Sequence, residues 1–124
     1  MSQALTKNPN LKILNLNDNT LTGKGATSIV NVLPHLQKLR ILNLGDCLLR
    51  TGGATVFTDA LAPKHLDVEG LNLDNNEIKI AGGLAMAKAM GNKEKLKELL
   101  INGNYFGENG KVLLKKELEK DSKL

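Results

Sequence analysis

The chain has 124 residues and a hydrophobic content of 41%, yet its large aromatic residues are limited to Phe57, Tyr105 and Phe106. A chain of this length fits one compact domain, and aliphatic side chains, above all leucines, must fill its core. The net charge is +4, from 17 basic and 13 acidic residues. The basic residues interleave with acidic ones and lack aromatic neighbours, which argues against nucleic-acid binding.

The sequence contains no signal for a membrane span or for export. No apolar stretch approaches the roughly 20 residues that a membrane-spanning helix needs. The N-terminal segment MSQALTKNPN lacks the apolar region of a signal peptide. The single cysteine, Cys47, excludes an internal disulfide and is typical of a reducing compartment. We therefore predict a soluble intracellular protein without membrane insertion.

A repeat organises the whole chain. LKILNLNDNTL at 11–21 recurs as LRILNLGDCLL at 39–49, VEGLNLDNNEI at 68–78 and LKELLINGNYF at 96–106, so successive repeats begin 28, 29 and 28 residues apart. Each fits the pattern LxxLxLxxN/CxL with an apolar residue at every leucine position. The pattern predicts an α/β leucine-rich repeat solenoid of the ribonuclease-inhibitor type. It would have about four strand–helix repeats, with parallel strands on the concave side and helices on the convex side.

The second half of each repeat predicts a helix. A glycine recurs where we expect a loop to enter the helix, and apolar residues follow it at a spacing of four, the period of one helical face. The glycines are Gly25, Gly53, Gly82 and Gly110; the apolar positions are Ile29, Phe57, Met86 and Leu114, then Leu33, Leu61, Met90 and Leu118. Pro34, Pro63 and residues 91–93 mark the predicted helix ends.

The two ends of the chain differ in their predicted role. We interpret 1–124 as a single domain whose residues 1–10 end a preceding repeat, which leaves an apolar N-terminal flank open to self-association. The last helix, by contrast, is predicted to point Leu113, Leu114 and Leu118 inward and its charged residues outward, as a C-terminal cap does.

One column of the repeat predicts a structural ladder. There the chain leaves the strand, and its backbone N–H and C=O groups lose their partners in the sheet. A buried carboxamide can hydrogen-bond both kinds of group, and a thiol is a small substitute with a weak donor. The residues of this column are Asn19, Cys47, Asn76 and Asn104.

The outward positions left free by the repeat are the candidates for partner binding. Asparagine and aspartate gather at the end of the predicted strands, which suggests a partner with a basic patch, although solvation alone also explains such residues. The candidates are Asn15, Asn17, Asp18, Asp46, Asp74 and Asn75.

Catalytic and metal sites find no support in the sequence. An EF-hand calcium loop starting at Asn15 would need glycine where Thr20 stands and glutamate where Ala26 stands. GKGATS at 23–28 lacks the lysine followed by serine or threonine of a phosphate-binding loop. His35 and His65 have no partners at metal-ligand spacing, and no nucleophile–base arrangement is evident. We predict no catalytic residue, no metal and no cofactor.

With the repeats laid out, the segments LNLNDNTLTGKGA, ILNLGDCLLRTGGA and LINGNYFGENG resemble the leucine-rich domain of Ran GTPase-activating proteins. The resemblance covers essentially the whole chain but corresponds to the C-terminal part of the family's domain, so we expect a fragment of a longer domain. Family members carry further repeats on the N-terminal side and commonly an acidic tail.

The resemblance implies a regulator of a GTPase, not an enzyme. The expected partner is the GTP-bound small GTPase Ran, and the expected role is GTPase activation in nucleocytoplasmic transport. The expected location is the cytoplasm, including the nuclear envelope. The family is understood to hold Ran's own glutamine in place; the asparagine credited with this belongs to repeats with no counterpart here. The alternative is a ribonuclease-inhibitor-type interaction module without effect on GTP hydrolysis.

Overall fold

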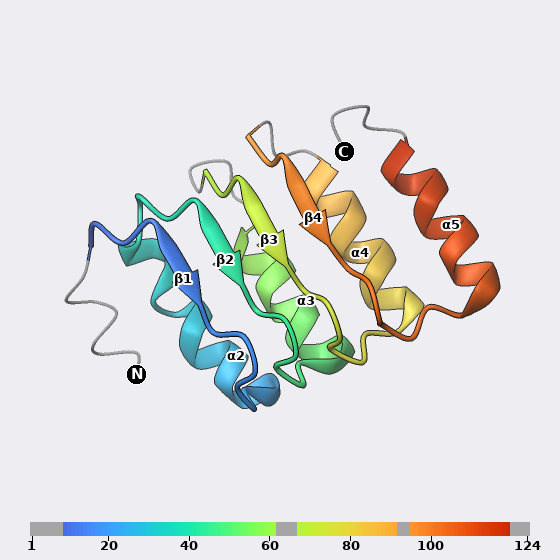
Figure 1. The fold of residues 1–124 in the computed structure, drawn as a ribbon, viewed down its shortest axis with the longest axis horizontal. Coiled ribbons are helices and arrows are strands. Elements are labelled where there is room, and N and C mark those ends of the chain that lie inside the picture. Colours follow the sequence, from blue (N-terminus) through green and yellow to red (C-terminus); the bar gives the residue numbers. More distant parts are fainter. Residues whose placement is uncertain (1–8, 62–66, 92–94, 120–124) are drawn as a thin grey trace.

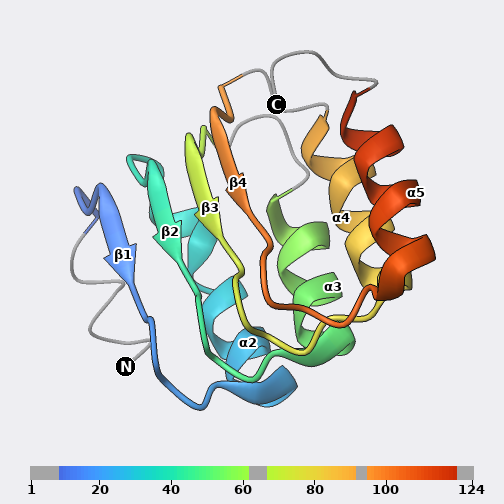
Figure 2. The same ribbon diagram turned by 45° about the vertical axis from the view of Figure 1, so that its right-hand side comes forward.

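The computed structural model describes residues 9–61, 67–91 and 95–119. Four parallel strands lie in chain order in one sheet, and a helix follows each of them behind the sheet (Figures 1 and 2). The strands are β1 (Ile13–Asn15), β2 (Ile41–Asn43), β3 (Gly70–Asn72) and β4 (Glu98–Leu100). The helices are α2 (Thr22–Val30), α3 (Arg50–Leu61), α4 (Ile80–Gly91) and α5 (Gly107–Glu119), with a short 3₁₀ turn, η1 (Leu33–His35), after α2. The predicted leucine-rich repeat solenoid is confirmed.

The pairing register places equivalent positions of the repeats side by side. Ile13 pairs with Ile41, Ile41 with Gly70 and Gly70 with Glu98. Because side chains alternate along a strand, the next residue of each strand points to the helices, and Leu14, Leu42 and Leu71 are buried there. The register therefore aligns a leucine column on the inner side, while the outward column of Ile13, Ile41, Gly70 and Glu98 is mixed in character.

The core lies between the sheet and the helices. Ile29, Phe57, Met86 and Leu114, spaced by the repeat, are all buried on the inner faces of α2, α3, α4 and α5. Burying one such side chain contributes roughly 1.5–3 kcal/mol. Leu11 and Leu21 of the first repeat are half-buried, whereas Leu39 and Leu49, their equivalents in the second repeat, are buried.

Two helix boundaries differ from the prediction. The glycine column lies inside the first helical turn, and a Cβ at Gly82 would approach Thr51 Cγ2 of the preceding repeat to 2.9 Å. The lack of a Cβ at Gly82 therefore allows α4 to pack closely on the preceding repeat. The first helix ends at Val30, before the predicted stop at Pro34, which lies within η1 together with His35. Pro63, His65 and residues 92–94 lie outside the described residues, as do residues 1–8 of the predicted preceding repeat.

The prediction for the inner face of α5 is partly wrong. Leu114 is buried, but Leu113 is 52% exposed. It lies one residue before the buried column, hence on another face of the helix. The side chain of Leu118 is outside the described part.

The face of α5 that corresponds to the contact face of α4 carries two lysines beside Val112, which is 56% exposed. Lys111 and Lys115 are exposed and occupy the positions that Gly83 and Ala87 hold in α4, where both are buried. Another repeat packed on this face would have to bury both ammonium groups.

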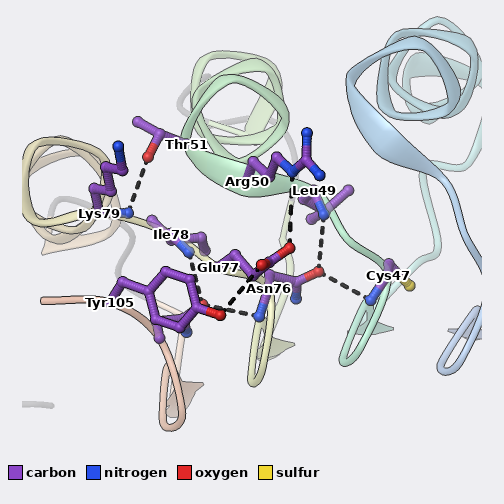
Figure 3. A network of polar contacts seen from close by, with 10 residues as sticks. Cys47, Leu49, Arg50, Thr51, Asn76, Glu77, Ile78, Lys79 and Tyr105 are labelled. Atoms are coloured by element: carbon purple, nitrogen blue, oxygen red, sulfur yellow. Dashed lines mark hydrogen bonds and ion pairs between the residues drawn. The ribbon is translucent and has the colours of Figure 1, made fainter.

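Carboxamides link neighbouring repeats where the strands end (Figure 3). Asn76 Oδ1 accepts hydrogen bonds from the Cys47 N–H at 2.9 Å and the Leu49 N–H at 3.2 Å. Its Nδ2 donates to the carbonyl oxygens of Leu44 at 2.8 Å and Asp74 at 3.0 Å. The fully buried side chain of Asn76 thus satisfies four backbone groups.

Asn104 repeats this arrangement one repeat later. Its Oδ1 accepts from the N–H groups of Asn76 at 2.9 Å and Ile78 at 3.1 Å. Its Nδ2 donates to the carbonyl oxygen of Leu73 at 3.0 Å. Asn19 at the other end donates its Nδ2 to the carbonyl oxygen of Leu16 at 2.8 Å.

Cys47 performs half of the carboxamide's role. Its thiol donates to the carbonyl oxygen of Leu16 at 3.0 Å, as Asn76 Nδ2 does to Leu44. Toward the preceding repeat its sulfur faces the Asn19 N–H in place of a carboxamide oxygen, and the Leu21 N–H turns to the Cys47 carbonyl oxygen at 3.0 Å. Burial raises the pKa of the thiol, partly opposed by the Asn19 backbone N–H, so the neutral donor form is favoured.

Replacing Asn76 with alanine should be strongly destabilising. The change leaves buried backbone groups of two repeats without partners, at about 1–3 kcal/mol for each unsatisfied group. We expect the free energy of unfolding, measured by urea titration with circular dichroism, to fall by about 3 kcal/mol. Asn109→Ala, at an exposed position of α5, is the control and should change it by less than about 0.5 kcal/mol. Equal effects of the two substitutions would contradict the ladder's role.

Substitutions of Cys47 should shift stability in opposite directions. Cys47→Asn replaces the weak sulfur acceptor with a carboxamide oxygen and should raise the free energy of unfolding by about 1 kcal/mol. Cys47→Ala removes the donor to the Leu16 carbonyl oxygen and should lower it by about 1 kcal/mol. The same urea titration measures both. A destabilising Cys47→Asn would show that the thiol's size, not its weak acceptor, determines the choice of residue.

Candidate functional site

Each strand ends in a turn, and the four turns stack into a continuous surface that we call the loop edge (residues 17–21, 45–49, 74–78 and 102–106). One column of the loop edge has a left-handed backbone throughout: Asp18, Asp46, Asn75 and Gly103 have φ between 55° and 69°. Aspartate, asparagine and glycine are the residues that adopt this conformation most readily. The backbone therefore supplies a structural reason for three of the predicted binding residues.

Asn15 also has a local role. Its Oδ1 accepts a hydrogen bond from the Asn17 N–H at 2.9 Å, which helps to form the turn. Asn43 and Asn72 make the same bond to Gly45 at 3.0 Å and Asp74 at 2.8 Å. The sequence prediction selected Asn15 from this column but not its two equivalents.

The fourth repeat obtains the same bond from its neighbour. Leu100 takes the place of the asparagine, and the Asn102 N–H donates instead to Asp74 Oδ1 at 2.6 Å. Asp74 is half-buried. This predicted binding residue thus satisfies the backbone of the next turn.

Asp18 and Asp46 are brought together across adjacent repeats. A hydrogen bond between the two carboxyl groups raises the pKa of Asp46, and burial and the charge of Asp18 raise it further. Asp18 Oδ2 also accepts from Asn17 Nδ2 at 2.9 Å. Asn17, Asp18 and Asp46 are all exposed, so three predicted binding residues form a contiguous acidic surface.

A groove of about 450 Å³ runs along the loop edge; we call it the loop-edge groove. It brings together the predicted residues Asp46 and Asn75 with others that the sequence prediction missed. Its lining residues are Thr20, Asp46, Leu48, Asn75, Glu77, Gly103 and Tyr105. Thr20, Leu48, Glu77 and Tyr105 share one column that the repeat pattern leaves variable, and this variability was the available signal.

The wall of the groove is held by a polar network across three repeats (Figure 3). Tyr105 Oη donates to Glu77 Oε1 at 3.2 Å, and Arg50 Nε lies 3.7 Å from Glu77 Oε2. The hydrogen bond to Glu77, the negative charge of that group and burial all raise the pKa of Tyr105. Glu77 thereby fixes the position of the tyrosine ring.

Leu48 and Glu77, which line the groove, adopt the left-handed region at φ 54° and 55°. For residues other than glycine, asparagine or aspartate this backbone is uncommon and costs of order 1–3 kcal/mol. Thr22 and Arg50, which do not line the groove, adopt the same region at φ 59° and 58°.

Two further searches cover the described residues only. Within 9–61, 67–91 and 95–119, no group of three or more His, Cys, Asp or Glu side chains is placed to hold a metal ion. In the same ranges no helix is long and apolar enough to cross a bilayer.

Parts of the amino-acid sequence match a known family and a known protein. A family model described as "Leucine Rich repeat" matches residues 7–30. The Ran GTPase-activating protein of Drosophila melanogaster is 45% identical over 53 residues, which is 43% of this chain and 9% of that protein. The chain therefore matches a small part of its relative's length.

Solved structures are similar over nearly the whole chain. The structure of leiomodin-1 actin-binding site 2 has a TM-score of 0.83 at 21% identity. The match covers 99% of this chain and 73% of the leiomodin-1 chain. The tropomodulin C-terminal domain of Caenorhabditis elegans has a TM-score of 0.60 at 11% identity. This match covers 98% of the present chain and 93% of the tropomodulin chain. These likenesses establish the fold, and with the sequence matches they support a leucine-rich protein-interaction module.

The carboxyl pair predicts a specific pH dependence. Because the pKa of Asp46 is raised above 3.8 in the fold, the folded state binds more protons than the unfolded state between 3.8 and the raised value. Stability therefore rises as pH falls through this window and is reduced above it. Asp46→Asn keeps a residue suited to the left-handed backbone and removes the repulsion. We expect it to raise the urea midpoint at pH 7 and to flatten its pH profile; an unchanged profile would contradict the pairing.

Proposed function

We propose that this chain is a leucine-rich segment of a GTPase activator for Ran and that it binds GTP-bound Ran through the loop edge. The observation that carries the proposal is the 45% identity over 53 residues to the Drosophila Ran GTPase-activating protein. The resemblance of LNLNDNTLTGKGA and ILNLGDCLLRTGGA to that family points the same way.

Small GTPases hydrolyse GTP slowly because the attacking water is poorly ordered and the transition-state charge poorly stabilised. A rigid partner accelerates the reaction when it orders the GTPase's own catalytic groups. The stacked turns of the loop edge are linked by Asn76 and Asn104 to neighbouring repeats. They offer such a rigid surface, and no residue of this chain is assigned a catalytic role.

A single-turnover assay of phosphate release from Ran–GTP tests the proposal. We expect the chain to accelerate hydrolysis by about tenfold or more, which corresponds to about 1.4 kcal/mol of transition-state stabilisation. Glu77→Ala should lose most of this acceleration because it removes both the acceptor for Tyr105 Oη and the counter-charge of Arg50. Asp59→Asn removes the same charge from an exposed site on α3 and should retain it.

Binding to Ran separates the alternatives. Biolayer interferometry with Ran carrying a non-hydrolysable GTP analogue should show complex formation, weaker with Ran–GDP. Binding without acceleration would favour an interaction module that does not affect GTP hydrolysis. If the chain neither binds Ran nor accelerates hydrolysis, the proposal is overturned.

A further inference from the structure

The loop-edge groove contains the one exposed ring among the Phe, Tyr and Trp residues of the chain. Of these three residues, Phe57 and Phe106 are buried, whereas Tyr105 is 58% exposed. Aromatic residues are enriched where proteins make their strongest contacts with partners. The fold thus places its single exposed ring beside a groove instead of in the core.

The charge of the groove is one-sided. Asp46 and Glu77 are its ionisable acids, and none of its lining residues is basic. Arg50 and Lys79 line a second hollow that shares Glu77 and Tyr105 with it. Glu77 has a counter-charge in Arg50, but Arg50 is not among the lining residues. Asp46 faces the carboxyl group of Asp18. A cation entering the groove would relieve this repulsion.

We propose that the loop-edge groove receives an arginine side chain of a protein partner, which stacks on the Tyr105 ring and pairs with the Asp46 carboxylate. A cation over an aromatic face gains electrostatic attraction from the ring. The half-buried Leu48 lines the same groove, where it contacts the aliphatic part of the incoming side chain.

Arginine fits these features better than lysine. Its guanidinium group is planar, stacks on aromatic rings and binds carboxylates with two parallel hydrogen bonds. Its weaker hydration lowers the cost of leaving water. Charge complementarity of this kind also orients the approaching partner.

This inference deepens the proposed partner-binding role of the loop edge and rests on that role. Its test needs no Ran. Failure of Ran binding would therefore leave the arginine site to be judged by itself, and the reverse also holds.

The experiment is a titration of the ¹⁵N-labelled chain, followed by NMR, with the peptide acetyl-Gly-Gly-Arg-Gly-Gly-amide. The same peptide with citrulline, an uncharged isostere of arginine, is the control, and a lysine peptide tests the choice of cation. We expect saturable shifts of the backbone amides of Asp46, Leu48 and Glu77 with the arginine peptide. The lysine peptide should bind more weakly and the citrulline peptide should cause no saturable shift.

Variants assign the binding to individual side chains. Tyr105→Leu should weaken it about two- to fivefold through loss of the ring, while Tyr105→Phe should retain it because the ring remains. Asp46→Asn should weaken it about three- to tenfold. Asp59→Asn, with the same loss of charge on α3, should leave it unchanged. Circular dichroism of each variant verifies the fold.

Three results would overturn the proposal. The first is equal binding of the arginine and citrulline peptides. The second is a pattern of shifts away from the loop-edge groove. The third is an equal effect of Asp46→Asn and Asp59→Asn, which would mean that only the overall charge matters.

Discussion

The structure depends on how the backbone is satisfied where each strand ends. A strand of three residues makes few ladder bonds, and beyond it the N–H and C=O groups must find other partners. Asn76 and Asn104 supply them from the next repeat, four backbone groups for Asn76 alone. Since each carboxamide bonds two repeats, the turns cannot move independently. The loop edge is therefore rigid for the same reason that the solenoid is stable.

The fold could be predicted from the sequence because its determinants are periodic. The leucines, the asparagine column and the helix positions each recur at a fixed distance, and the parallel register simply aligns them. The errors arose at positions whose residue type changes from one repeat to the next. Leu113 was placed inward by composition, although the helical spacing from Leu114 assigns it to another face. The groove was missed because Thr20, Leu48, Glu77 and Tyr105 share a column but no chemistry.

The same constraint changes the meaning of the acidic and amide residues at the loop edge. Asp18, Asp46 and Asn75 occupy a left-handed backbone, so a turn without any partner would select the same residue types. Their identity is weak evidence for binding. Leu48 and Glu77 are different, because they occupy that backbone against their preference. Thr22 and Arg50 do the same without lining the groove, so this backbone belongs to the turns of the repeat as well as to the groove.

Electrostatics at the loop edge run against the charge of the whole chain. The net charge of +4 would repel a basic partner at long range. Such repulsion is screened beyond about 8 Å at physiological ionic strength, a distance shorter than the width of four stacked repeats. Within that range a partner at the loop edge meets Asp18, Asp46 and Glu77, with Arg50 and Lys79 in the hollow next to Tyr105. Local charge, not net charge, then determines which partner this surface selects. Because the surface is rigid, its few charged side chains stay at fixed positions relative to the partner's charges.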